Sequence, residues 1–555
     1  MACTPEGLPV TAASGVVSPV AADARAAADV ISADYLRQQI TRFSADEFQG
    51  RATATPGDSK ARNYLVEQLR KIGFEPAGPG GTWQQPFELV GVTAHLPGEW
   101  SFGRGEESIS FRWWDQFIAT SGVQRDKVSI KHAEVVFVGY GIQAPEYGWD
   151  DFKGQDLKGK VLLMLNSDPD WDPSLFAGTT RLYYGRWIYK YESAARHGAV
   201  GAIIVHTTSS AGYPFQVVQN SWGGQQFELA GEGASTLEVR GWMTEAASRD
   251  LLRFAGQDFD TLVAGARSKD FRPVPLDVTT SLEFTNTVGR ASTANVYGVL
   301  EGSDPQLKNQ YVVYSAHYDH LGVGEPDAKG DRIYNGAMDN AAGVAQLLAI
   351  GRAYKALPKA PRRSIMLLFA GAEEQEMLGS QYYVTHPTIA PGNIAANINY
   401  DGGNKWGRAR DVIYVGKGKT TLDPYVEEIA RYQGRVVKPD QFPDRGYFYR
   451  SDQFSFAKVG VPALYLNTGN DFIGRPPGWG RQQHELYEEK NYHQPSDQID
   501  SSWNFDGMIE DAQLGFYVGV SAANANEMPG WVPGDEFEAT RKAALATRAE
   551  RKTPR

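Results

Sequence analysis

The sequence contains a single cysteine, Cys3, among its 555 residues. An intrachain disulfide is therefore impossible, and so is a metal site built on several thiolates. Any metal ion that the chain binds has to be held by histidine nitrogens and carboxylate oxygens.

Long apolar runs are also missing. The longest, SIMLLFA and VLLML, stop well short of the ~20 residues that a membrane-spanning helix needs, so we expect no transmembrane span. The hydrophobic content of 42% and the aromatic content of 12% are typical of a well-packed globular protein. At 555 residues the chain is too long for one ordinary core, and we expect two or three folded units.

The third feature that the sequence lacks is a basic stripe. Its 66 acidic and 55 basic residues are scattered along the chain and give a formal net charge of -11. We therefore expect no nucleic acid partner. The acidic balance favours solubility but identifies no substrate.

Cys3 lies ahead of an Ala-, Val-, Ser- and Pro-rich stretch that is typical of a flexible tether, which we place at residues 1–30. Two interpretations of this cysteine stay open. Either it is incidental at a frayed terminus, or Ala2-Cys3 is the remnant of a bacterial lipoprotein signal. The second interpretation predicts a lipid anchor at Cys3 and a periplasmic, cell-envelope or secreted location.

Three patterns follow one another after the tether. Helical spacing in PGDSKARNYLVEQLRKIG predicts a helix that begins at Asp58 or Ser59 and ends at Gly73. From about residue 131, short β runs punctuated by glycine predict a mainly β insert. From about Leu282, strands alternate with helices, as in a doubly wound sheet covered on both faces.

We therefore predict an α/β fold, with a doubly wound mixed sheet flanked by helices and an inserted, mainly β domain. The core domain is expected to be discontinuous, at residues 31–130 and 276–530, with the insert at 131–275. The charged residues 531–555 are expected to form a peripheral helix or tail.

Side chains of the types that bind metals follow several predicted strands or open the next helix. They are His317 and Asp319 after YVVYSA, Glu373 and Glu374 after SIMLLFAGA, Asp401 after NIAANINY, Asp339 at DNAAGVAQLL, and His493 in YHQPSDQID. Alone, each has an ordinary role; an Asp before a helix, for example, is usually a cap that stabilises it by roughly 1 kcal/mol. Together they would require four independent coincidences at the functional edge of one sheet, which favours a shared site.

These residue types suit a pair of zinc ions. Zinc accepts imidazole nitrogen and carboxylate oxygen, and a pair of ions needs one bridging carboxylate. Asp339 is the predicted bridge. His317 and Asp401 would complete one ion, while Glu374 and His493 would complete the other. Co²⁺ or Mn²⁺ would satisfy the same ligands.

Two acidic residues remain beside the predicted ions. Asp319, two residues after His317, is placed to accept the other imidazole N–H. Glu373 is left without a metal to bind, which is the position of a general base that takes a proton from water and adds about 10² to 10⁴-fold to the rate. Glu373 and Asp319 are therefore the predicted catalytic residues.

Five segments, SAHYDHLG, NGAMDNAAG, FAGAEEQEMLGS, NYDGG and YHQPSD, resemble those of the M-28 family of two-zinc metallopeptidases, in the family's order. The resemblance is to bacterial aminopeptidases that carry an inserted protease-associated (PA) domain. It covers most of the chain from about residue 35 to 525. It implies a zinc-peptidase, phosphorylase/hydrolase-like fold and the same ligand roles.

The resemblance further implies a cis peptide between Asp339 and Asn340. It also implies a substrate pocket lined by residues of RSDQFSF and its neighbours, with the insert's YYGRW and VVQNSW as a lid. The expected substrate-binding residues are Tyr449, Ser451, Asp452 and Tyr492.

The function expected from the residues and the resemblance together is a zinc-dependent exopeptidase, an aminopeptidase acting on peptides with a free N-terminus. Three alternatives within the same superfamily stay open: a carboxypeptidase, a glutaminyl cyclase, and a receptor-like binding protein without catalysis. The presence of every expected ligand favours an enzyme.

Overall fold

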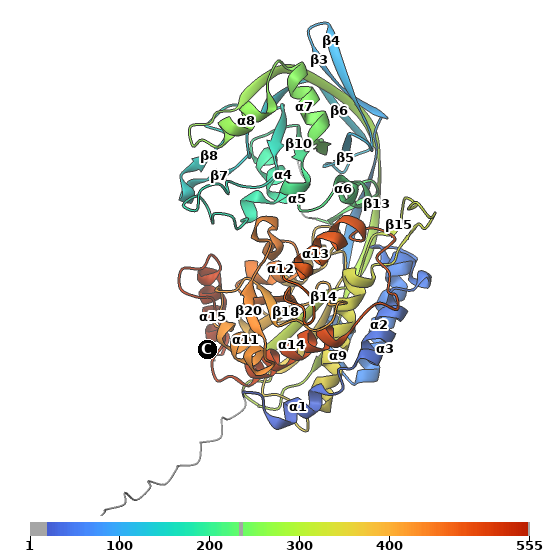
Figure 1. Cartoon of the computed structure of the whole chain (residues 1–555), viewed down its shortest axis with the longest axis vertical. Helices are drawn as coiled ribbons and strands as arrows, with labels where there is room; N and C mark the ends of the chain where they lie inside the picture. Colours follow the sequence, from blue (N-terminus) through green and yellow to red (C-terminus); the bar gives the residue numbers. More distant parts are fainter. Residues whose placement is uncertain (1–18, 232–236, 553–555) are drawn as a thin grey trace, which may run out of the picture.

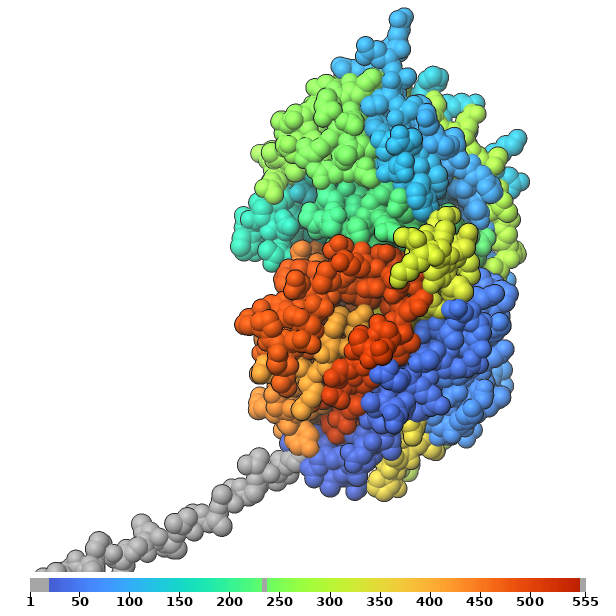
Figure 2. Space-filling view, turned by 45° about the vertical axis from the view of Figure 1, so that its right-hand side comes forward, coloured from blue at the N-terminus to red at the C-terminus, as the bar shows by residue number. Residues whose placement is uncertain are grey.

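The computed structural model describes residues 19–231 and 237–552, so Cys3 and its expected anchor lie outside the described residues. Two lobes lie one above the other along the long axis of the molecule (Figure 1). The lower lobe contains the N-terminal helices and the C-terminal half of the chain, whereas the upper lobe contains the middle of the chain. Figure 2 shows the two lobes in direct contact, with the green upper segments resting on the orange and red lower ones.

A mixed sheet forms the centre of the lower lobe, and the strands predicted after Leu282 are present in it. The central strands β17, β14, β18 and β21 run parallel in that spatial order, with antiparallel partners on both sides. The bounds are β2 (Gln84–His95), β13 (Val274–Leu300), β14 (Tyr311–His317), β17 (Ser364–Ala370), β18 (Ile394–Asn399), β19 (Asp411–Val415), β20 (Val436–Pro439) and β21 (Ala463–Thr468).

Helices cover both faces of this sheet, because its strands are apolar on both sides. Along β17, Ile365 and Leu367 point into the core beneath α9 (Ala342–Ala356) and α14 (Asp506–Asn524). Met366 and Leu368 point to the opposite face, beneath α10 (Leu378–Thr385) and α12 (Gln453–Lys458). The predicted doubly wound α/β arrangement is therefore confirmed.

The N-terminal helix α3 (Pro56–Ile72) starts slightly earlier than predicted. The Thr55 hydroxyl accepts the Asp58 N–H at 3.4 Å, and Pro56 occupies the first helical position, where its missing N–H costs no hydrogen bond. The helix ends at Gly73 as predicted, since this residue adopts a φ of 91° that favours glycine.

One strand connects the two lobes. The 27 residues of β13 pair first with β6 (Lys127–Phe137) in the upper lobe and then with β2; its last residues pair with β17 in the lower lobe. The expected boundary at residues 275/276 therefore lies inside a continuous strand. A rigid two-stranded ribbon, rather than a flexible linker, joins the insert to the rest of the chain.

The insert is more helical than expected. Its strands β9 (Val161–Leu165), β10 (Gly201–His206) and β12 (Val239–Thr244) are parallel neighbours. Parallel pairing needs a crossover between strands, and helices are the usual crossover. The helices include α4 (Trp187–Arg196), α6 (Phe215–Trp222), α7 (Glu245–Phe254) and α8 (Phe259–Ala266). The segment is therefore mixed α/β rather than mainly β.

The C-terminal part of the expected tether at residues 1–30 is a helix, while residues 1–18 lie outside the described residues. Helix α1 (Ala22–Ala28) buries Ala24, Ala27 and Ala28 against the lower-lobe core, because alanine favours helix and lets helices approach closely. At the other end, α15 (Glu538–Lys552) forms the expected peripheral helix. None of the described helices combines the length and the apolarity that crossing a bilayer requires.

Candidate metal centre

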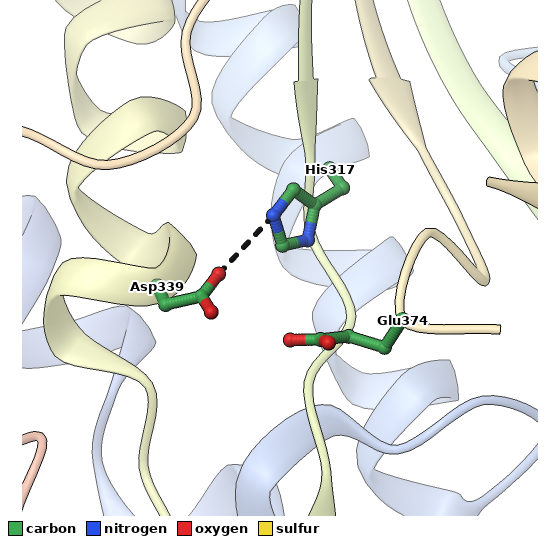
Figure 3. Close-up of side chains that lie close together, drawn as sticks. All are labelled: His317, Asp339 and Glu374. Carbon is green, nitrogen blue, oxygen red and sulfur yellow. Dashed lines mark ion pairs between the residues drawn. The ribbon is translucent and has the colours of Figure 1, made fainter. Parts of the chain in front are cut away.

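The predicted ligands converge at the carboxyl edge of the central sheet. His317 is the last residue of β14, Glu373 and Glu374 lie in the turn after β17, and Asp401 follows β18 by two residues. Parallel strands that end side by side bring these side chains together. Figure 3 shows His317, Asp339 and Glu374 pointing into one space from three different segments.

Asp339 lies between the two histidines. Its Oδ1 is 3.2 Å from His317 Nε2, and its Oδ2 is 3.3 Å from His493 Nε2. Asp401 Oδ1 lies 3.2 Å from the same nitrogen of His317. Glu374 Oε2 lies 3.1 Å from the same nitrogen of His493. The donors therefore form two groups that share Asp339. One contains Asp339 Oδ1, His317 and Asp401, and the other contains Asp339 Oδ2, His493 and Glu374.

The spacing of these donors fits metal ions. Ligand atoms 2.0–2.1 Å from a tetrahedral zinc are about 3.3 Å from one another, close to the distances just given. The buried His493 Nε2 makes no hydrogen bond with the described residues although two carboxylates are near it. The nitrogen is therefore free to donate its lone pair. His317, Asp339 and Glu374 also place one donor atom each within 4.8 Å of the others.

The ring of His317 is oriented by a contact at Nδ1, the nitrogen on the far side from the other candidate ligands. Its Nδ1 lies 3.3 Å from the backbone carbonyl oxygen of Asp319 and 3.9 Å from the Asp319 carboxylate. The predicted acceptor was the carboxylate, but the nearer acceptor is the carbonyl of the same residue. The Asp319 carboxylate instead accepts the backbone N–H groups of Glu373 at 3.0 Å and Glu374 at 3.2 Å. It fixes the turn that carries both glutamates.

Glu373 lies beside the donor groups without joining them. Its Oε2 is 4.0 Å from His317 Nε2, and its side chain is 10% exposed. Burial raises the pKa of Glu373 well above its usual range, with Asp401 and Glu374 adding to the shift although His317 opposes it. A carboxylate with a raised pKa takes up protons readily, as a general base has to.

Asp339 is held by a second carboxylate, Asp497. Asp497 Oδ2 accepts the Asp339 N–H at 3.0 Å, and both of its oxygens accept the Met338 N–H at 3.1 Å. The expected cis peptide between Asp339 and Asn340 is confirmed. Asp497 belongs to the YHQPSD segment, yet nothing in the sequence alone distinguished it from a surface residue.

Sequence reasoning also missed His320. This buried side chain approaches Glu374, with its Nδ1 2.6 Å from Glu374 Oε1. Burial acts to raise the pKa of Glu374, but His493 and His320 lower it to about 2. His320 stands three residues after His317 in SAHYDHLG, and that position on a strand-exit loop was the available signal.

The insert reaches the same centre. Ser221 Oγ on α6 lies 2.8 Å from His493 Nδ1, and Asn220 Nδ2 donates to the His493 carbonyl at 2.8 Å. The His493 tautomer that donates its Nδ1–H to Ser221 presents the Nε2 lone pair towards Asp339 and Glu374. The insert therefore contributes to the orientation of one of the candidate ligands.

A cavity opens beside the donors. Ser451 and Tyr492 line it, as expected for substrate-binding residues. The other two expected residues do not: Tyr449 packs in an apolar cluster with its hydroxyl on Glu536, and Asp452 is fully buried.

Comparison with known proteins agrees with this geometry. Residues 295–517 match the family model described as "Peptidase family M28". Leupeptin-inactivating enzyme 1 of Streptomyces exfoliatus is 24% identical over 266 residues, covering 47% of this chain and 55% of that protein. Aminopeptidase YwaD of Bacillus subtilis strain 168 is 29% identical over 224 residues, covering 39% of this chain and 41% of that protein. The chain thus matches about half the length of these relatives.

A solved structure shares the fold. An aminopeptidase from Aneurinibacillus sp. strain AM-1 aligns with a TM-score of 0.54 at 18% identity, covering 91% of this chain and 97% of that one. The two lobes therefore recur together in another protein.

Proposed function

Because residues 295–517 form a domain of peptidase family M28, we propose that the protein is a zinc-dependent aminopeptidase that releases N-terminal residues from peptides. The observation that carries the proposal is the position of Asp339 between two sets of donors, with Glu373 beside them. A peptidase of this class needs both elements: a metal pair and a base without a metal to bind.

The proposed metal ligands follow from this arrangement. His317 and Asp401 would hold one ion, Glu374 and His493 the other, and Asp339 would bridge them. Bound zinc would polarise the scissile carbonyl and lower the pKa of water. The hydrogen bonds that Asp319 and Asp497 accept, and the contact of Ser221 with His493, support the proposal, because metal ligands and a general base need fixed positions.

Glu373 is the proposed general base. Its carboxylate would accept a proton from the attacking water and return it to the leaving amine as the peptide bond breaks. The hydrogen bond from its backbone N–H to Asp319 keeps the side chain at the rim of the cavity. Asp319 is therefore proposed as a positioning residue for this base.

The cavity favours recognition of a free amino terminus. Asp401 and Glu488 line it, and Glu488 Oε2 is buried without a hydrogen-bond partner among the described residues. Glu488 Oε1 already pairs with Arg445 at 3.7 Å and Arg450 also lines the cavity, so the free Oε2 is the atom proposed to accept from an ammonium group. This observation favours an aminopeptidase over a carboxypeptidase.

We also propose that residues 131–275 are a PA-type insert that covers the site. The upper lobe has buried cores of its own, and its helix α6 contacts His493. Contacts between Ser221 and His493 support a lid that is part of the site rather than a separate module.

A matched panel of substrates tests the proposal. Purified protein should hydrolyse leucine p-nitroanilide but not its N-acetyl derivative, and a chelator should abolish the activity until zinc is restored. Release of C-terminal residues from amino-blocked peptides would instead identify a carboxypeptidase, and cyclisation of an N-terminal glutamine a glutaminyl cyclase. A protein that binds no metal and turns over none of these substrates would fit a receptor-like role.

A further inference from the structure

Arg186, in the insert, carries a buried guanidinium without a partner. The residue is 6% exposed and immediately precedes helix α4. Its Nε is buried without an acceptor, and its guanidinium forms no ion pair or side-chain hydrogen bond with any residue in the described part of the chain. A largely buried cation without a counter-ion is unfavourable unless an anion completes the site.

Three other buried arginines of this protein have acceptors for their guanidinium groups. Arg51 donates to four backbone carbonyls, and Arg363 donates to Gln310 and to three carbonyls. Arg541 likewise donates to the carbonyls of Pro391, Pro529 and Ile394. The fold can therefore provide acceptors for a buried guanidinium, and it does not do so at Arg186.

A second arginine nearby is only partly satisfied. Arg450, from the lower lobe, donates from Nη2 to the Tyr492 hydroxyl at 3.3 Å, while its Nη1 is buried without an acceptor. Its guanidinium carbon is 5.4 Å from the ring centre of Tyr213 in the insert. Burial and the charge of Arg450 lower the pKa of Arg186 to about 9. Burial acts to lower the pKa of Arg450, but Tyr492 and the Glu488 carboxylate raise it above its usual range. Arg186 is therefore the less compensated of the two cations.

Both arginines line a cavity of about 840 Å³ between the lobes. Glu373, Glu374 and His493 line the same cavity, so it opens onto the metal centre. Arg240, a third arginine in the wall, is compensated by Glu228 at 3.5 Å and Glu376 at 3.7 Å. Among the arginines that line this cavity, Arg186 is thus the one without an acceptor or an ion pair, while Arg450 keeps one nitrogen without an acceptor.

The two cavities beside the metal centre share Glu373, Glu374 and Arg450 and differ in their other charged residues. Asp401 and Glu488 line only the first, whereas Arg186 and the ion-paired Arg240 and Glu376 line only the second. A short peptide has an ammonium group at one end and a carboxylate at the other, and the metal centre lies between the two cavities.

We propose that Arg186 and Arg450 form a carboxylate-binding subsite for the part of the substrate that follows the scissile bond. This inference rests on the proposed aminopeptidase function. The carboxylate has two sources: the C-terminus of a dipeptide or tripeptide, or an acidic side chain next to the scissile bond. In either case the enzyme prefers substrates with a negative charge on the leaving side.

The test compares Leu-Leu with Leu-Leu-amide, which differ only in that charge, and with Leu-Asp-amide, which moves it to a side chain. For the native protein, kcat/KM should be about 10- to 100-fold higher for at least one charged substrate than for Leu-Leu-amide, as charge-assisted hydrogen bonds imply. A higher kcat/KM for Leu-Leu would identify the C-terminal carboxylate as the group that is bound, and a higher value for Leu-Asp-amide would identify the acidic side chain. Equal values for all three would overturn the subsite while leaving the proposed function intact.

The Arg186→Met protein should lose this preference, so that the ratio of kcat/KM for the charged peptide to that for Leu-Leu-amide falls to about one. Arg253→Met is the matched control, because Arg253 also belongs to the insert but its side chain is 76% exposed. Removing an unpaired buried charge should leave the melting temperature of the substrate-free protein equal or higher. A marked drop in melting temperature, or a preference that survives the substitution, would overturn the proposal.

Binding provides a readout independent of turnover. In the Glu373→Gln protein, calorimetric titration should give tighter binding of the preferred charged peptide than of Leu-Leu-amide, and Arg186→Met should remove the difference. Arg186-dependent binding without hydrolysis by the native protein would establish the subsite and refute the proposed aminopeptidase function. Equal binding of the charged peptides and the amide would refute the subsite.

Discussion

Asp319 fixes the backbone of Glu373. Its Oδ1 accepts the Glu373 N–H at 3.0 Å, and its Oδ2 accepts the N–H of the next residue, Glu374, at 3.2 Å. One buried carboxylate thus positions both the proposed base and a proposed metal ligand. The same residue offers its carbonyl to His317, so three functional side chains depend on it.

Asp319→Asn should therefore impair catalysis without removing any group that contacts the metal or substrate. The new amide presents an NH₂ group to a backbone N–H, and one of the two turn hydrogen bonds is lost. We expect kcat to fall about 10- to 100-fold, in the range found for groups that support metal sites. Steady-state kinetics with leucine p-nitroanilide measures this, and an unchanged kcat would show that the turn holds its shape without Asp319.

Glu373→Gln should abolish most of the activity while metal binding persists. Glutamine has nearly the same shape but cannot accept a proton, so kcat should fall about 10² to 10⁴-fold. Asp401→Asn is the comparison variant, since a proposed ligand rather than the base is removed there. Metal analysis should show native zinc content in the first variant and a reduced content in the second; loss of zinc from Glu373→Gln would contradict its assignment as the base.

Ser221→Ala should weaken metal binding from the insert side. The substitution removes the Oγ that lies 2.8 Å from His493 Nδ1 and leaves that imidazole free to rotate. We expect zinc affinity, measured by competition with a chromophoric chelator, to fall about tenfold. Ser209→Ala, at an exposed serine of the same lobe, serves as the control and should have native affinity. Identical affinities in the two variants would argue against a role of the insert in the site.

Arg51 connects the N-terminal segment to the loops of the metal centre. Its guanidinium donates to the carbonyls of Tyr318, Asn335 and Gly336 at 2.8, 2.7 and 3.0 Å, and to Phe43 at 3.0 Å. Arg51→Met leaves these buried carbonyls without donors and should reduce the free energy of unfolding by about 3–5 kcal/mol.

Arg42→Met is the matched control for this change. Arg42 is about half exposed and pairs with Glu47, so its loss should cost at most about 1 kcal/mol. Urea unfolding of both variants measures the difference. Equal midpoints would mean that the contacts of Arg51 contribute no more than a surface ion pair.

His206 should make stability depend on pH in the acidic range. Burial lowers the pKa of His206 to about 4 from its ordinary value near 6.5, because the neutral ring is retained inside the insert beside the Tyr213 carbonyl. Between these two values the unfolded chain binds a proton that the folded chain does not, so stability falls as the pH drops from about 6.5 to about 4.

The loss attributable to His206 should approach about 3 kcal/mol at the acidic end of this range. Thermal unfolding of the native protein and of His206→Gln, followed from pH 7 to pH 4, isolates the contribution. The variant should show a shallower decline. Parallel curves for the two proteins would assign the acid sensitivity to other groups.

The sequence by itself determined the α/β core and the set of candidate ligands. The apolar strand β17 and the helix α9 are encoded by local periodicity, and a side chain that directly follows a strand is placed by the strand itself. His317, Glu374 and Asp401 could therefore be found without coordinates. The single cysteine had already restricted the donors to imidazole and carboxylate.

The tertiary structure alone decided the contacts between distant segments. Ser221 and His493 are 272 residues apart, and no local pattern relates them. Arg186 of the insert and Arg450 of the lower lobe line one cavity, and the missing acceptors of Arg186 Nε and Arg450 Nη1 leave no trace in a sequence. Whether His317 meets the carbonyl or the carboxylate of Asp319 depends on backbone and side-chain torsions that residue spacing does not specify. Local periodicity thus placed the ligands, while packing between the lobes determined what surrounds them.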